Sequence, residues 1–249
     1  MLNSMTTSFV ARLKRNDESA WFELWETFGP VIRAQLAKWG KGRIGSQTVQ
    51  DLSQETMAAL SDSIDRYDPA RGARFSTWLL AIAKHVLGDE MDKRNAQKRG
   101  SGKRGGGFDE AWMASSAASV DGQYEAAVFR AKVEKAIRLV EKECEFMDFS
   151  IYRMRVLDGQ PGKAVSAALG ISEPTVSRRL ARVRDMLRAK LREVIETYSF
   201  TREEMEEPDR NGLLLNPTKA DDELFDESVA EIFHRQAEMR RQEQASVRD

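Results

Sequence analysis

Apolar side chains in the N-terminal part of the chain recur every three or four residues. The pattern covers four stretches, at 20–28, 31–39, 48–64 and 74–94. This spacing places the apolar positions on one face of an α-helix, and we interpret the first two stretches as separate helices divided at Pro30. Asp68-Pro69 and Gly72 are turn signals before the last stretch. No segment sustains the two-residue alternation of a strand, so the chain is predicted to be all-α.

A glycine-rich segment divides the helical pattern into two parts. Residues 99–120 contain five glycines among serines and alanines, a composition that cannot bury enough apolar surface to become ordered. We therefore expect a flexible linker over 99–124, with helical domains at 1–98 and 125–198. Residues 199–249 are expected to form a C-terminal extension.

Charge is distributed unevenly over these parts, although the net charge of the whole chain is only −1. The first domain carries +2, the linker 0, the second domain +4 and the extension −7. Seven basic residues and one acidic residue lie within 174–192. This local density suits contacts with DNA phosphates better than a generic solvated helix face.

The extension contains a candidate amphipathic helix from about 220 to 244. Its apolar positions are Leu224, Phe225, Val229, Ile232, Phe233 and Met239. Acidic residues gather at its start, where the helix dipole favours them. We hypothesise that this helix docks on the basic second domain or on a regulator and can mask the recognition helix of that domain, which begins at Glu173. A disordered acidic tail is the alternative.

The second domain contains the pattern of a helix-turn-helix at 163–192. Gly170 can take the positive φ of a tight turn, and Ser172 can cap the helix that begins at Glu173-Pro174. The outward face of this second helix carries donors suited to phosphates and base edges, namely Thr175, Ser177, Arg178, Arg179 and Arg182. A plain helical hairpin with a solvated basic face is the alternative interpretation.

Four strings in the chain, taken in order, carry a family resemblance. They are Asp51-Leu52-Ser53-Gln54-Glu55, Tyr67-Asp68-Pro69, Phe75-Ser76-Thr77-Trp78-Leu79-Leu80-Ala81-Ile82-Ala83 and Gly170-Ile171-Ser172-Glu173-Pro174-Thr175-Val176-Ser177-Arg178-Arg179-Leu180. Over about residues 8–198 the chain resembles the bacterial sigma factors of the sigma-70 family, specifically the extracytoplasmic-function (ECF) group. The resemblance implies a subunit that binds core RNA polymerase and promoter DNA, with no catalytic centre and no cofactor. An anti-sigma factor or another regulator is a further candidate partner.

The resemblance also implies functions for three sets of residues. The polymerase-binding set is Asp51, Leu52, Gln54 and Glu55, of which the three polar residues share one helix face while Leu52 points inward. The minus-ten set is Tyr67, Asp68, Arg71, Arg74, Lys84, His85, Lys93 and Arg94. The minus-thirty-five set is Ser172, Thr175, Ser177, Arg178, Arg179 and Arg182.

Each set has a simpler alternative interpretation. From spacing alone, the acidic face at 51–55 is an ordinary solvated helix face, and His85 is a solvated or core histidine. The resemblance implies that the minus-ten region captures a flipped base of the promoter, and contacts with the protein must offset the free energy of unstacking that base. Phe75 and Trp78 recur at core spacing, so we expect the loop before them to capture the base. The chain departs from the family pattern at Gln160-Pro161-Gly162-Lys163, and the resemblance does not extend to the acidic extension.

Two other functions are weighed against a sigma factor. A conventional helix-turn-helix regulator would bind duplex DNA without polymerase, and the motif at 51–55 argues against it. A nucleic-acid-processing enzyme is disfavoured because the chain has two histidines, one cysteine, no phosphate-cradling glycine loop and no clustered metal ligands. We therefore expect no enzyme and no metal site.

The compartment is inferred from simple features of the chain. No apolar run approaches the roughly 18 residues that span a bilayer, and the N-terminal residues do not have the pattern of a signal peptide. The single cysteine, Cys144, cannot form an internal disulfide. A cytoplasmic protein that does not bind a membrane is expected.

Overall fold

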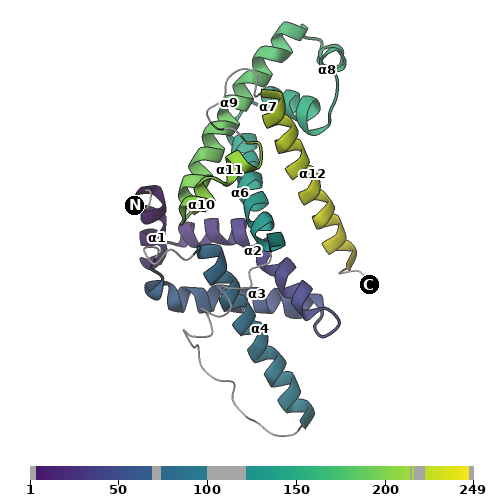
Figure 1. Ribbon diagram of the computed structural model, residues 1–249. Coiled ribbons are helices and arrows are strands. Elements are labelled where there is room, and N and C mark those ends of the chain that lie inside the picture. Colours follow the sequence, from purple (N-terminus) through teal and green to yellow (C-terminus); the bar gives the residue numbers. More distant parts are fainter. Residues whose placement is uncertain (1–3, 69–73, 100–121, 214, 216–221, 247–249) are drawn as a thin grey trace. The chain divides into compact units, whose positions relative to one another are not determined.

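The computed structural model describes residues 4–68, 74–99, 122–213, 215 and 222–246, and every regular element in these ranges is helical (Figure 1). The prediction of an all-α protein is confirmed. The chain divides into two compact units, Met1–Val128 and Phe129–Asp249, and the boundary falls within helix α6 (Gly122–Glu143).

Unit 1 is built on the three long helices α2 (Glu18–Gly40), α3 (Ser46–Ser63) and α4 (Phe75–Arg99), with a shorter α1 (Ser4–Lys14) and the 3-10 turn η1 (Ile64–Arg66). Helix α3 packs against both α2 and α4, and α1 packs against α2. The buried side chains of these helices form one core that includes Leu13, Leu24, Phe28, Leu36, Leu52, Leu60, Phe75 and Ile82.

Asp17 fixes the turn between α1 and α2. Its carboxylate accepts hydrogen bonds from the backbone N–H groups of Ser19 (2.9 Å) and Ala20 (3.3 Å), and so caps the start of α2. The Arg12 guanidinium donates to the same carboxylate at 2.8 Å. This hydrogen bond is the main reason why the pKa of Asp17 lies well below its ordinary value.

Pro30 lies inside α2, so the prediction of two separate helices at 20–28 and 31–39 is wrong. A proline in a helix interior removes one backbone hydrogen bond and costs about 3 kcal/mol. Phe28, Val31 and Ile32, on both sides of the proline, are at most 5% exposed. Burial of each such side chain contributes about 1.5–3 kcal/mol, so packing against one common core outweighs the proline.

The predicted linker at 99–124 overlaps helices at both ends. Arg99 is the last residue of α4, and α6 begins at Gly122. The Tyr124 hydroxyl donates to the carbonyl oxygen of Ser76 at 2.9 Å, so the first turn of α6 belongs to unit 1. The middle of the predicted linker, 100–121, lies outside the described residues.

Unit 2 contains the rest of α6, then α7 (Phe146–Tyr152), a π-helical turn η3 (Arg153–Leu157), α8 (Gly162–Leu169) and the long α9 (Glu173–Tyr198). Helices α7 and α8 both pack against α9. A small apolar cluster joins them, formed by buried Ile151, Val165 and Val176 with Met154, Leu169, Ile171 and Leu180 around it.

The acidic extension folds onto unit 2. It forms the short helices α10 (Arg202–Met205) and α11 (Glu207–Arg210) and the long α12 (Asp222–Ser246). Lys132 of α6 is fully buried and lies 3.8 Å from a carboxylate oxygen of Glu204 and 3.7 Å from one of Glu207. A charge buried in this way requires such partners, so α10 and α11 are part of the folded domain.

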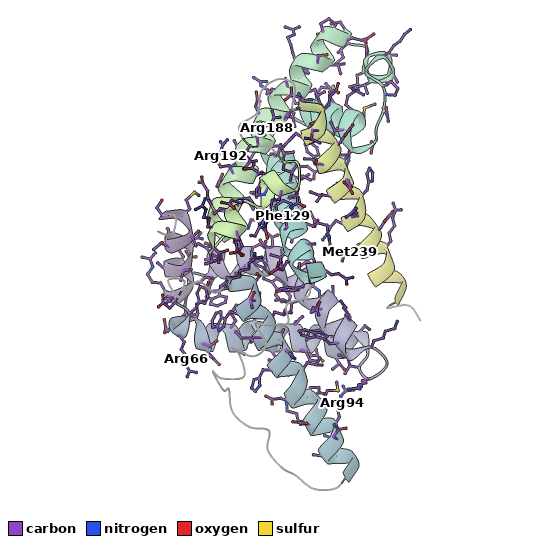
Figure 2. The ribbon with its side chains drawn as sticks, in the orientation of Figure 1. Arg66, Arg94, Phe129, Arg188, Arg192 and Met239 are labelled. Atoms are coloured by element: carbon purple, nitrogen blue, oxygen red, sulfur yellow. The ribbon has the colours of Figure 1, made fainter. Side chains whose placement is uncertain are left out.

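Arginines of α9 hold the start of α12 in place. Arg184 donates twice to Asp226, at 3.1 and 2.6 Å, and once to Asp222, at 2.7 Å. Arg188, labelled in Figure 2, lies on α9. It donates to Asp222 at 2.9 Å and lies over the ring of Phe225, 4.6 Å from its centroid. Helix α12 lies where the sequence predicts a helix at 220–244.

We expect Phe225→Ala to lower the free energy of unfolding by about 3–5 kcal/mol, because Phe225 is fully buried and its removal leaves a cavity. Leu224→Ala is the matched control: this side chain is 48% exposed, and its loss should change the free energy by about 0.5 kcal/mol or less. Urea unfolding followed by circular dichroism measures both. Equal, small effects would contradict the packing of α12 on unit 2.

Candidate nucleic-acid interface

Helix α3 presents the polar residues of the predicted polymerase-binding set to solvent. Asp51, Gln54 and Glu55 are exposed and share one face of the helix, and the Asp51 carboxylate accepts a hydrogen bond from the Gln47 side chain at 3.1 Å. Leu52 is only 1% exposed. Its side chain packs in the core beneath the exposed face, and its place in the polymerase-binding set stays a prediction.

Tyr67 is a core residue, although the sequence placed it on the DNA surface. Its side chain is 4% exposed, its ring stacks on Trp78 with the centroids 5.0 Å apart, and the edge of Phe75 lies against it at 5.2 Å. The Lys14 ammonium donates to the Tyr67 carbonyl oxygen at 3.1 Å. A DNA base cannot stack on this ring unless the core opens. The expectation that Phe75 belongs to the core is confirmed.

The loop that follows Tyr67 is described only at its ends. Asp68 is exposed, and Arg71 lies outside the described residues. Arg74 forms an ion pair with Glu125 at 3.0 Å, and its side chain is only 15% exposed. Its guanidinium thus joins α4 to the start of α6 and offers little surface to a ligand.

Helix α4 carries the other predicted minus-ten residues. Lys84 and Lys93 are exposed, and the His85 ring lies 3.6 Å from the Asp89 carboxylate on the next turn. Arg94 donates to the Glu90 carboxylate at 2.6 Å, the Arg43 carbonyl oxygen at 3.0 Å and the Thr48 hydroxyl at 3.0 Å. Arg94 therefore fastens α4 to the segment before α3 and to the first turn of α3, a structural function that the sequence did not indicate.

A tight turn joins α8 to α9. Gly170 adopts φ 65° and ψ 27°, as predicted, and so ends α8 in the left-handed region. The Ser166 hydroxyl donates to the Ile171 carbonyl oxygen at 2.5 Å. Ser172 occupies the N-cap position of α9, but its hydroxyl lies 2.9 Å from the Thr175 hydroxyl and makes no capping hydrogen bond, which corrects its predicted capping function.

The start of α9 exposes only part of the predicted minus-thirty-five set. Ser172, Ser177 and Arg178 are exposed, and Thr175 is half-buried. Arg179 donates to the carboxylate of Asp148 at 2.5 Å, and Arg182 donates to the other carboxylate oxygen at 3.4 Å. Sequence reasoning missed Asp148 as the partner of these arginines, because nothing in the local pattern of α7 indicates a contact across 31 residues.

Four basic residues in the second half of the run at 174–192 have partners within unit 2. Arg184 and Arg188 bind the carboxylates of α12. Lys190 lies 2.9 Å from Glu143, and Arg192 donates to the Leu215 carbonyl oxygen at 2.6 Å. Much of the positive charge counted in the sequence therefore stabilises the fold and is not presented to DNA.

Docking of α12 leaves the beginning of α9 uncovered. Ser177 and Arg178 are exposed, and the Arg182 side chain is 67% exposed, while α12 is held by residues further along α9. The docked α12 therefore does not cover these residues in this structure, and masking of the recognition helix stays a hypothesis.

Two further properties concern the described residues alone. Within them, no group of three or more histidine, cysteine, aspartate or glutamate side chains is arranged to hold a metal ion, and no helix is long and apolar enough to cross a membrane.

Burial raises the pKa of the Cys144 thiol, and the nearby carboxylates of Asp148 and Glu145 raise it further.

Comparison with known proteins gives one family match. Residues 24–97, from α2 through most of α4, match the family model of sigma-70 region 2. The match contains the exposed face of α3 and the described minus-ten residues, and it ends before α6. No curated protein matches the chain. Together, the three packed helices and the match over residues 24–97 support a factor of the sigma-70 family.

Proposed function

We propose that this protein is a sigma factor of the ECF group, which binds core RNA polymerase and directs promoter-specific initiation of transcription in the cytoplasm. The observation that carries the proposal is the match of residues 24–97 to sigma-70 region 2. The factor contributes binding surfaces and no catalytic centre. Core RNA polymerase and promoter DNA are its partners, and an anti-sigma factor is a further candidate.

The exposed face of α3 is the proposed polymerase contact. Asp51 and Glu55 lie one turn apart and are both exposed, which leaves two carboxylates accessible to a basic protein surface. Buried Leu52, between them, fixes the helix in the core of unit 1. The packing of α3 in the core thus holds the acidic face in a fixed position, so this face can bind a partner with little rearrangement.

Promoter DNA is proposed to contact both units. In unit 1, Asp68, Lys84 and Lys93 are the exposed members of the minus-ten set among the residues that the structure describes. In unit 2, the first turns of α9 are proposed to read the minus-thirty-five element, with Ser177 and Arg178 outermost. A helix-turn-helix regulator that binds duplex DNA without polymerase is the competing function, and sigma-70 region 2 in residues 24–97 favours the sigma factor over it.

Adding the purified full-length protein to core RNA polymerase and genomic DNA should produce transcripts from new start sites that share upstream sequence elements. Sequencing of the 5′ ends measures this directly, and core polymerase alone is the control. If the protein bound DNA fragments but produced no new start sites, the regulator would replace the sigma factor as the better explanation.

The double substitution of Asp51→Asn and Glu55→Gln should weaken binding to core polymerase by about tenfold or more, because charge-assisted hydrogen bonds contribute about 1.5–3 kcal/mol each. Asp62→Asn is a control on the same helix, since Asp62 is exposed and lies beyond the proposed contact. Binding is measured by fluorescence anisotropy with labelled full-length protein. Equal affinities of the double variant and the control would argue against this face.

Arg178→Ala should reduce the preference for the minus-thirty-five duplex by about 1–3 kcal/mol, the usual contribution of an arginine that reads base edges. Arg202→Ala removes the same charge from α10, where the side chain is 91% exposed, and should leave the preference unchanged. Competition binding between a selected duplex and a scrambled duplex measures both variants. A uniform loss of affinity for both duplexes would instead indicate a phosphate contact.

A further inference from the structure

Asp148 is a buried carboxylate beside the helix that is proposed to read DNA. It lies in the first turn of α7, and its side chain is 1% exposed. One carboxylate oxygen accepts from Arg179 at 2.5 Å, and the other lies 3.4 Å from an N–H donor of Arg182. Each oxygen of one side chain is therefore directed at a different arginine of α9.

The burial of Asp148 makes these contacts obligatory. A carboxylate removed from water is stable only when it is paired and hydrogen-bonded. Arg179 and Arg182 are three residues apart on α9, so they lie on the same side of that helix. Their guanidiniums are thus drawn to one point on α7, whereas the Arg178 side chain is exposed.

The two arginines are held to different degrees. The Arg179 side chain is 37% exposed and also lies 3.7 Å from Glu145, whereas the Arg182 side chain is 67% exposed. A guanidinium has five N–H donors, so Arg182 can donate one to Asp148 and still direct others outward. Arg179 has two carboxylates beside it, so it mainly links α9 to α7.

An unrestrained arginine on a DNA-binding helix binds any phosphate within its reach, and such contacts carry no sequence information. Two unrestrained arginines at this position would strengthen binding to all DNA. Fixing them on a buried carboxylate lowers this general attraction and leaves discrimination to the groups that reach the base edges.

We propose that Asp148 is a specificity-determining positioning residue: it holds Arg179 and Arg182, limits their contacts with phosphates, and so makes binding depend on Arg178 and the hydroxyl groups at the start of α9. The proposal rests on the proposed function of α9 in reading the minus-thirty-five element. It adds a residue of α7, outside the helix-turn-helix, to the specificity of that element.

The test compares full-length wild-type protein with Asp148→Asn. Each protein is titrated at several salt concentrations with a duplex selected from the mapped start sites and with a scrambled duplex. Asp148→Asn should bind the scrambled duplex more tightly, and its slope of log affinity against log salt should steepen by about 0.9 for each new phosphate contact. The affinity ratio of selected to scrambled duplex should fall by about tenfold.

Glu145→Gln is the matched control. It removes the same negative charge three residues away, and it also faces Arg179, but the Glu145 side chain is 72% exposed. Solvent screens such a pair, so the salt slope and the affinity ratio should stay close to those of the wild type. Equal changes in both variants would show a general effect of charge and would overturn the proposal, as would no change in Asp148→Asn.

Arg182→Lys is a second variant that keeps the test decisive if Asp148→Asn does not fold. Lysine keeps the charge but lacks the planar guanidinium fork that Asp148 binds, so its ammonium is released to contact phosphates. The salt slope should therefore steepen and the affinity ratio should fall, as for Asp148→Asn; an unchanged slope and ratio would overturn the proposal. If the wild-type protein itself does not distinguish the two duplexes, the proposed function of α9 fails instead.

Discussion

Each arginine of α9 either pairs with a carboxylate of the protein or stays exposed at the surface. The organisation of unit 2 depends on which arginines are paired. Arg184 and Arg188 bind Asp222 and Asp226 and so fix α12. Arg179 binds Asp148 and so links α9 to α7. Arg178 remains exposed. One basic helix thus serves both as the framework of the domain and as its candidate DNA-reading surface.

Unit 1 combines a fixed core with a polar surface in a similar way. The stacked rings of Tyr67 and Trp78, together with Phe75, close the core beside the loop that was expected to capture a base. Arg94 fastens α4 to Arg43, before α3, and to Thr48, in the first turn of α3, by one hydrogen bond each, and a third bond joins it to Glu90 within α4. The exposed carboxylates of α3 and the exposed lysines of α4 are therefore presented on helices that are packed and cross-linked.

The described residues of the acidic extension form part of the folded second unit. Its charge suggested attraction to the basic second domain, and the ion pairs of Arg184 and Arg188 agree with that. Burial of Phe225 and Val229 adds an apolar contribution that salt cannot screen. Because the exposed residues at the start of α9 stay uncovered, the contact supports α9 without hiding the surface proposed to read DNA.

The sequence by itself determined the all-α class, the turn at Gly170, a helix at about 220–244 and the polar motif at 51–55, because helical periodicity, glycine conformation and short motifs are local properties. It did not predict α1 or the continuity of α2 through Pro30. Only the tertiary structure decided which polar residues are used internally. Tyr67, Arg94 and Arg179 looked like surface contacts, but their partners lie elsewhere in the fold, and burial and ion pairing depend on neighbours that are distant in the chain.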